Sequence, residues 1–163
     1  MLNTKILHRA AEIVKIFKQK NYKIATVESC TGGLITAYLT GVSGSSEVVD
    51  RGFTTYSNEA KNELVEVPMG LINRYGAVSE EVARSMAQGG LKNSRSDVTI
   101  SVTGIAGPGG GSPEKPVGLV HFGWASHLKG IRSCQKIFEG DRTSVREHTV
   151  LEAFQILELT IRD

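Results

Sequence analysis

The sequence predicts an α/β fold, a single three-layer α/β/α domain over residues 1–163 with a mixed sheet between two layers of helices. Segments with apolar residues at helical spacing alternate with short β-branched segments along much of the chain. Two strand-like segments then follow each other directly. Alternation favours parallel strands joined by helices, and adjacent strands favour an antiparallel hairpin, so we expect a mixed sheet.

The first half of the chain is expected to form two helices and two strands before residue 57. An amphipathic helix is predicted over 3–20, because apolar residues recur at helical spacing from Ile6 to Phe17 and charged residues fill the other face. The β-branched run over 23–27 predicts a buried strand. A second helix begins at Leu34, and the composition of 48–56 predicts a second strand.

The second half begins with helices and ends with strands and one long helix. Asn58 is expected to cap a helix, Pro68 to open a short one, and Ser79 to cap a third. A strand is predicted over 98–102, a hairpin over 117–125 and 131–138, and a final helix from about residue 143. The glycine-rich loop over 104–116 is long enough to indicate a function.

Composition excludes several classes of protein. The 163 residues are 40% hydrophobic and 22% charged with a net charge of +2, which is typical of a globular protein and does not indicate nucleic acid or an anionic membrane as a partner. No apolar run approaches the roughly 20 residues of a membrane span. Cys30 and Cys134 lack disulfide or metal spacing. With no signal peptide apparent, we expect a soluble cytoplasmic protein without a metal.

The first candidate site is the segment Glu28–Gly33, between a predicted strand and a predicted helix. Ser29 there could attack a carbonyl group, and the N–H groups around Thr31, Gly32 and Gly33 could stabilise the developing oxyanion. Cys30 is a rival nucleophile, because a helix N-terminus lowers the pKa of a thiol, although a buried small thiol is the more common use of cysteine. A plain helix cap with a tight glycine turn is the simpler alternative.

A serine nucleophile needs a base, and none of the four histidines lies in a turn motif. Lys61 is the better candidate, because it ends the segment Tyr56–Lys61 at a strand-to-helix junction. A desolvated lysine can be neutral near pH 7, and the Tyr56 hydroxyl could position it or relay its proton. The alternative is an ordinary solvated lysine on a helix.

Two further segments could bind a ligand. Thr103 and Gly104 leave a predicted strand and enter the glycine-rich loop, which matches neither a P-loop nor a dinucleotide-binding fingerprint. Arg142 precedes the last helix and could bind a phosphate or carboxylate. The alternative is that Asp141 or Thr143 simply caps that helix.

Taken together, these segments resemble one family. The stretches 26–33, 56–61, 76–80, 101–108, 115–118 and 140–142 resemble the CinA C-terminal domain family, in order and over nearly the entire chain. The resemblance implies an α/β/α domain in its stand-alone form that hydrolyses the carboxamide of nicotinamide mononucleotide to nicotinic acid mononucleotide and ammonia. It implies Ser29 as nucleophile, Lys61 as base and Tyr56 in support, with Thr103 and Arg142 also in the site and no cofactor.

The leading hypothesis is therefore a serine amidohydrolase acting on a small nucleotide. The oxyanion would lie against residues 31–33, and Thr103, Gly104 and Arg142 would bind the rest of the substrate. The alternative is a non-catalytic nucleotide-binding or regulatory module, which would need neither Ser29 nor Lys61. Association into a homo-oligomer stays open.

Overall fold

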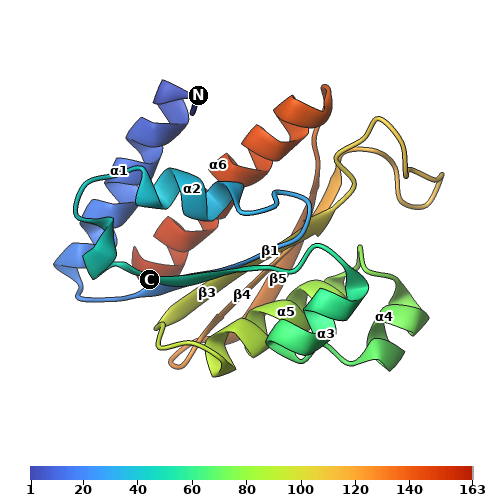
Figure 1. Cartoon of the computed structure of the whole chain (residues 1–163), viewed down its shortest axis with the longest axis horizontal. Coiled ribbons are helices and arrows are strands. Elements are labelled where there is room, and N and C mark those ends of the chain that lie inside the picture. Colours follow the sequence, from blue (N-terminus) through green and yellow to red (C-terminus); the bar gives the residue numbers. More distant parts are fainter. Residues whose placement is uncertain (163) are drawn as a thin grey trace.

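A five-stranded mixed sheet lies at the centre of the computed structural model, which describes residues 1–162 (Figure 1). The strand order is β2-β1-β3-β4-β5. The strands are β1 Ile24–Glu28, β2 Val49–Thr54, β3 Val98–Gly104, β4 Leu119–Ser126 and β5 Gly130–Ile137. β1 is parallel to β2 and β3, whereas β4 is antiparallel to β3 and β5, so the expected mixed sheet is confirmed. Asp163, the end of the expected domain, lies outside the described residues.

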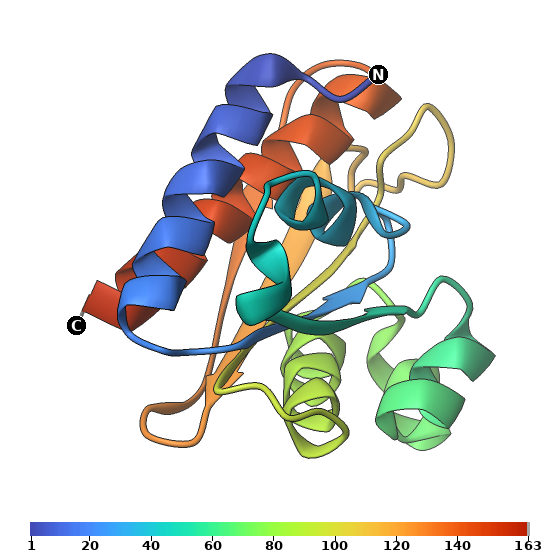
Figure 2. The ribbon, with the colours of Figure 1, turned by 60° about the vertical axis from the view of Figure 1, so that its left-hand side comes forward.

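Helices cover both faces of the sheet, which confirms the three-layer prediction (Figure 1 and Figure 2). One layer contains α1 Thr4–Gln19, α2 Leu34–Thr40 and α6 Arg142–Arg162. The other contains α3 Asn58–Val65, α4 Met69–Tyr75 and α5 Glu80–Lys92. A short 3₁₀ helix, η1 Ser45–Glu47, lies between α2 and β2.

The helix caps follow the sequence with one correction. The Ser79 side chain caps α5 as predicted, accepting from the N–H of Val82. The predicted cap of α3 at Asn58 is wrong, because Ser57 has the extended backbone of a cap and its Oγ accepts from the N–H of Ala60 at 3.0 Å. Asn58 is the first helical residue instead.

The sheet separates two hydrophobic cores. The larger includes Phe17, Tyr38 and Phe154 and lies on the side of α1, α2 and α6. The smaller lies on the side of α3, α4 and α5 and includes Val65 and Met86. Here the hydroxyls of β3 also hold α5, because Thr99 and Ser101 donate to the carbonyl oxygens of Ala87 and Ala83 at 2.7 and 2.6 Å.

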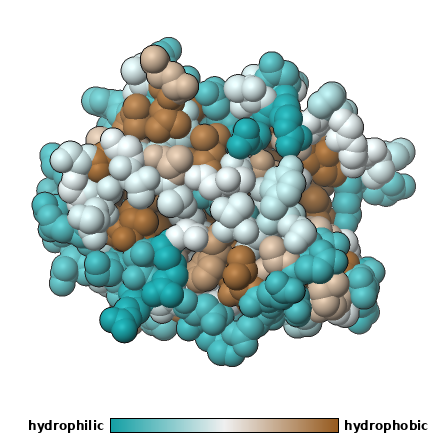
Figure 3. Space-filling view, in the orientation of Figure 1, coloured by the Kyte–Doolittle hydropathy of each residue, from teal (hydrophilic) through white to brown (hydrophobic). Residues whose placement is uncertain are grey.

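The helices within residues 1–162 differ from a membrane span in length or in composition. Among residues 1–162, no helix combines the length and the apolar composition needed to cross a bilayer. On the face shown in Figure 3, hydrophobic residues occur as separate patches among hydrophilic ones.

The carboxyl ends of the three parallel strands meet at one edge of the sheet, where open α/β sheets bind ligands. Helix α3 follows β2 at this edge and packs closely against α5. A Cβ added at Gly89 of α5 would lie 1.7 Å from the carbonyl oxygen of Val65, so only glycine permits this approach. The position of α3 therefore depends on a glycine in another helix.

This contact predicts that Gly89→Ala lowers the free energy of unfolding by about 1–3 kcal/mol, because the added methyl overlaps the α3 backbone. Gly70→Ala in α4 is the matched control, since nothing lies within 4 Å of its added Cβ. That control should be neutral or stabilising by about 0.5–1 kcal/mol. Urea denaturation of both variants measures the difference, and equal effects would contradict the assigned contact.

Candidate active site

Ser29 lies in a tight turn between β1 and α2. Its N–H donates to Val102 O of the neighbouring strand β3 at 3.0 Å, and its carbonyl oxygen accepts from the N–H of Gly32 at 3.0 Å. Gly32 and Gly33 have φ values of 59° and 103°, a left-handed conformation that glycine adopts without strain. The turn is thus tied to the sheet on one side and closed on itself on the other.

Lys61 of α3 brings its amine to the Ser29 hydroxyl. The side chain is buried, with 1% of the residue exposed. Its Nζ donates to Ser29 Oγ at 3.0 Å, to Thr55 O at 2.9 Å and to Tyr56 O at 3.4 Å. All three acceptors are neutral oxygens, and Lys61 has no ion-pair partner within residues 1–162.

The surroundings of Lys61 disfavour its ammonium form more than those of an exposed lysine do. Burial lowers the pKa of Lys61 from its ordinary value of 10.5, and a smaller opposing effect comes from Cys30. Desolvation penalises the ammonium form, and no carboxylate compensates for it. A neutral amine has two N–H groups for the carbonyl oxygens of Thr55 and Tyr56 and a lone pair that can accept from the Ser29 hydroxyl, so the arrangement can supply a base next to a hydroxyl nucleophile.

Cys30 is poorly suited to the nucleophile role that the sequence left open. The side chain is buried, and burial, followed by the charge of Glu28, raises the pKa of the Cys30 thiol to about 12. The expectation of a lowered pKa at a helix N-terminus is wrong here, because burial and the charge of Glu28 outweigh the effects that lower it. The N–H groups at the start of α2 are also bound to a carboxylate.

Glu28, at the end of β1, supplies that carboxylate. It is 1% exposed and accepts from the N–H groups of Gly33, Ile35 and Thr36 at 3.2, 2.9 and 2.8 Å. Its oxygens also accept from the hydroxyls of Thr31 and Thr36. This residue has no role in the site predicted from the sequence. One feature of the sequence could have indicated its role: Glu28 lies shortly before α2, and the cap residue of that helix, Gly33, has no side chain to accept from the first N–H groups.

These contacts correct the expected oxyanion site. The N–H of Gly33 binds Glu28 and that of Gly32 binds Ser29 O, so neither is free for a substrate. The Thr31 side chain is likewise turned to Glu28. Within the described chain, the N–H groups of Cys30 and Thr31 donate to no protein acceptor, which makes them the available pair.

Tyr56 and Arg142 form the outer part of the site. Tyr56 is 60% exposed, and its hydroxyl accepts from Arg142 Nη2 at 3.1 Å rather than contacting Lys61 as expected. The contact between Tyr56 and Lys61 runs through the tyrosine carbonyl. Arg142 Nη1 donates to Gly107 O at 2.8 Å, and within residues 1–162 the guanidinium has no ion-pair partner.

Thr103 and Gly104 lie where the sequence placed them, at the end of β3, but both are engaged in packing. Thr103 Oγ1 donates to Ala77 O at 2.8 Å. A Cβ at Gly104 would lie 2.7 Å from Leu119 O, so glycine is required by the approach of β4.

A cavity of about 190 Å³ opens at this point. Residues from five segments line it: Ser29, Cys30, Tyr56, Asn58, Lys61, Ala77, Val78, Thr103, Gly104, Ala106 and Arg142. A second cavity of about 440 Å³ shares Ala106 and Arg142 with it and extends along Pro108, Val117 and Gly140. Arg142 therefore stands at the boundary between a small inner space beside Ser29 and a larger outer one.

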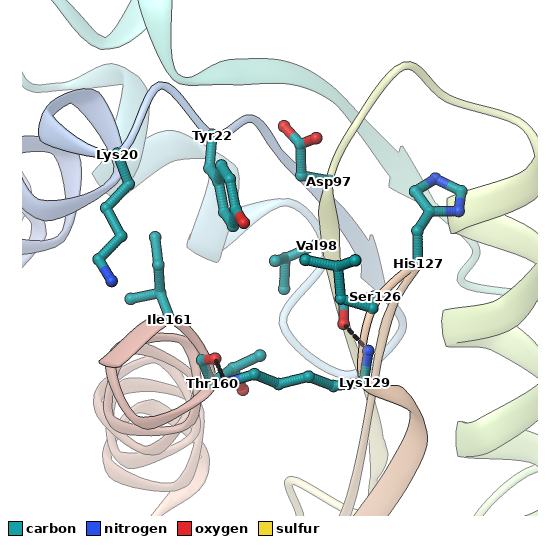
Figure 4. A pocket seen from close by; sticks show the side chains of 10 residues that line it. Lys20, Tyr22, Asp97, Val98, Ser126, His127, Lys129, Thr160 and Ile161 are labelled. Carbon is teal, nitrogen blue, oxygen red and sulfur yellow. Dashed lines mark hydrogen bonds between the residues drawn. The ribbon is translucent and has the colours of Figure 1, made fainter. Parts of the chain in front are cut away.

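Another cavity, of about 250 Å³, lies at the opposite end of the sheet (Figure 4). Tyr22, Val98 and Ile161 contribute to its wall, and Lys129 Nζ is bound to Thr160 O. It contains no paired nucleophile and base. No group of three or more histidine, cysteine or acidic side chains within residues 1–162 is arranged to hold a metal ion. The cavity at Ser29 is thus the candidate active site.

Comparison with known proteins places this chain in a family. The model of the CinA C-terminal domain matches residues 7–161. The chain is 46% identical over 155 residues to the nicotinamide-nucleotide amidohydrolase PncC of Enterobacter agglomerans, covering 94% of each chain. It is 51% identical over 151 residues to a protein of Caldicellulosiruptor bescii described as competence-damage inducible, but spans only 36% of that protein's length.

A solved structure agrees over the entire chain. The competence/damage inducible protein CihA from Agrobacterium tumefaciens superposes with a TM-score of 0.94 at 41% identity, covering 100% of this chain and 99% of that one. The family match over most of the sequence, the full-length relative and the shared fold agree. The chain belongs to the CinA C-terminal domain family.

Proposed function

We propose that this protein is a serine amidohydrolase that converts nicotinamide mononucleotide to nicotinic acid mononucleotide and ammonia. The observation that carries the proposal is the buried amine of Lys61 at 3.0 Å from Ser29 Oγ. The substrate is supported by the name of the relative from Enterobacter agglomerans, which is a nicotinamide-nucleotide amidohydrolase. The cytoplasmic location and any self-association stay predictions.

In the proposed reaction, Ser29 Oγ attacks the carboxamide carbon while neutral Lys61 takes the hydroxyl proton. The N–H groups of Cys30 and Thr31 bind the oxyanion of the tetrahedral intermediate. Its collapse breaks the C–N bond, and Lys61 returns the proton to the departing ammonia. Water, activated by the same amine, then hydrolyses the acyl-enzyme and releases the carboxylate product.

The outer cavity suits the ribose phosphate of such a substrate. Arg142 donates only to neutral oxygens, so its positive charge is available to an anionic group at the boundary of the two cavities. Thr103 and Gly104 would then shape the inner wall. A non-catalytic nucleotide-binding module would use the cavities and Arg142 but would not need a buried lysine on a serine hydroxyl.

Purified protein is expected to release ammonia from nicotinamide mononucleotide, and Ser29→Ala should reduce the rate on the order of 10³-fold or more. The substitution removes the nucleophile without opening the core. Cys30→Ala is the neighbouring control and should lose far less. An enzyme-coupled assay measures the rate of ammonia release by the wild-type protein and both variants. Near wild-type turnover by Ser29→Ala would reject the nucleophile, and no turnover by the unmodified protein would favour the binding module.

Lys61→Arg should be nearly as inactive as Lys61→Ala, although it keeps the positive charge. An arginine stays protonated at any workable pH and cannot accept the serine proton. Steady-state rates are compared with Lys61→Met, which keeps the length of the side chain, and thermal unfolding verifies that each variant folds. Retention of most activity by Lys61→Arg would contradict the assignment of Lys61 as base.

The rate should rise with pH through the pKa of Lys61. Because burial lowers this pKa below 10.5, the neutral, active form is populated at a lower pH than in an exposed lysine. Activity is therefore expected to be lost as the pH falls through the lowered pKa and to reach a plateau before 10.5. A profile of kcat/KM against pH measures this loss of activity and the plateau. A rate that falls over this range as the pH rises would show that the protonated amine is required.

A further inference from the structure

Arg146 reaches from α6 to the turn that carries Ser29. Its Nε donates to Cys30 O at 3.2 Å, and Nη2 donates to Thr31 O at 2.8 Å. The side chain is half-buried, does not line the cavity and forms no ion pair within residues 1–162. The guanidinium group of Arg146 therefore binds two carbonyl oxygens of the same turn.

The bond to Cys30 O acts on the N–H of Thr31, and the bond to Thr31 O acts on the N–H of Gly32, which in turn binds Ser29 O. In a trans peptide the C=O and N–H point in opposite directions, so holding Cys30 O fixes the direction of the Thr31 N–H. The Cys30 N–H is fixed in the same way, because Ser29 O is held by the N–H of Gly32. A charge-assisted bond to a carbonyl also polarises its peptide group, which makes the N–H of that group a stronger donor.

We propose that Arg146 is a positioning residue for the oxyanion-binding N–H groups of Cys30 and Thr31. The inference rests on the proposed attack by Ser29. Arg146 acts through the backbone and touches no part of the substrate. Because the negative oxygen exists only after the attack, the loss of Arg146 should lower kcat and leave KM nearly unchanged.

The test compares Arg146→Ala and Arg146→Lys with Arg95→Met, which removes an exposed arginine in the loop before β3. Arg146→Ala should lose about tenfold to a hundredfold in kcat, with KM within about twofold of wild type. Added guanidinium ions at millimolar concentration should restore part of that loss. Arg146→Lys should have a kcat close to that of Arg146→Ala, because one ammonium group cannot reproduce the two donors of a planar guanidinium group. Arg95→Met should match wild type.

A second readout separates this inference from the substrate assignment. A fluorophosphonate forms a bond between Ser29 Oγ and phosphorus, fluoride departs, and the hydroxyl proton passes to Lys61. The rate of this labelling, followed by intact-protein mass, should fall in Arg146→Ala in parallel with kcat, because negative charge also develops on the phosphonyl oxygen. A wild-type protein that is labelled but releases no ammonia would reject the substrate and leave the labelling rates to test Arg146.

Three outcomes would overturn the role of Arg146. The first is an unchanged kcat and labelling rate in a variant that is only less stable to heat, which would show a structural role alone. The second is a raised KM with unchanged kcat, which would show direct substrate binding. The third is a wild-type protein with neither labelling nor turnover, which would reject the reactive Ser29 on which the inference rests. If Arg146→Ala does not fold, the kcat and the labelling rate of Arg146→Lys provide the test instead.

Discussion

A lysine amine that is buried away from carboxylates must be satisfied by neutral oxygens, and the site is organised around that requirement. Lys61 meets it with one serine hydroxyl and two carbonyl oxygens from the end of β2. The same burial that lowers its pKa also excludes the solvent that would compete for these acceptors. This contact requires α3 to lie against the sheet edge, and the packing of α3 on α5 provides that. It also requires a rigid Ser29 turn, which the contacts of Glu28 provide.

The turn illustrates how one segment can satisfy opposite electrostatic demands. The N–H groups at the start of α2 meet the carboxylate of Glu28, while the carbonyl groups of Cys30 and Thr31 meet the guanidinium of Arg146. The polar groups of the turn are thus engaged by fixed partners on two sides, and two N–H groups are left for a ligand. A backbone fixed in this way needs no reorganisation when charge develops, which is the condition for electrostatic catalysis.

Much of this was predictable from the sequence, for reasons that differ between elements. The periodicity of α1 and the alternation of helices with strands are local signals, and they predict the layers correctly. The resemblance to the family names Ser29, Lys61, Tyr56, Thr103 and Arg142, all of which line one cavity. Glu28 and Arg146 were not predicted, because most of their partners are backbone atoms and Arg146 lies 116 positions from Cys30 along the chain. The raised pKa of the Cys30 thiol could not be predicted, because it depends on burial, which no local pattern reports.

The docking of α6 onto the Ser29 turn has a consequence for biosynthesis. The turn follows β1, whereas the two arginines that reach the site belong to α6, more than 80 positions later along the chain. During translation, β1 and α3 leave the ribosome long before α6, so a nascent chain can form most of its sheet while the turn lacks its cationic partner. The site is therefore completed by a segment that emerges well after the Ser29 turn, and a chain cut short before residue 142 would keep Ser29 and Lys61 but lack the guanidinium group that binds the carbonyl oxygens of the turn.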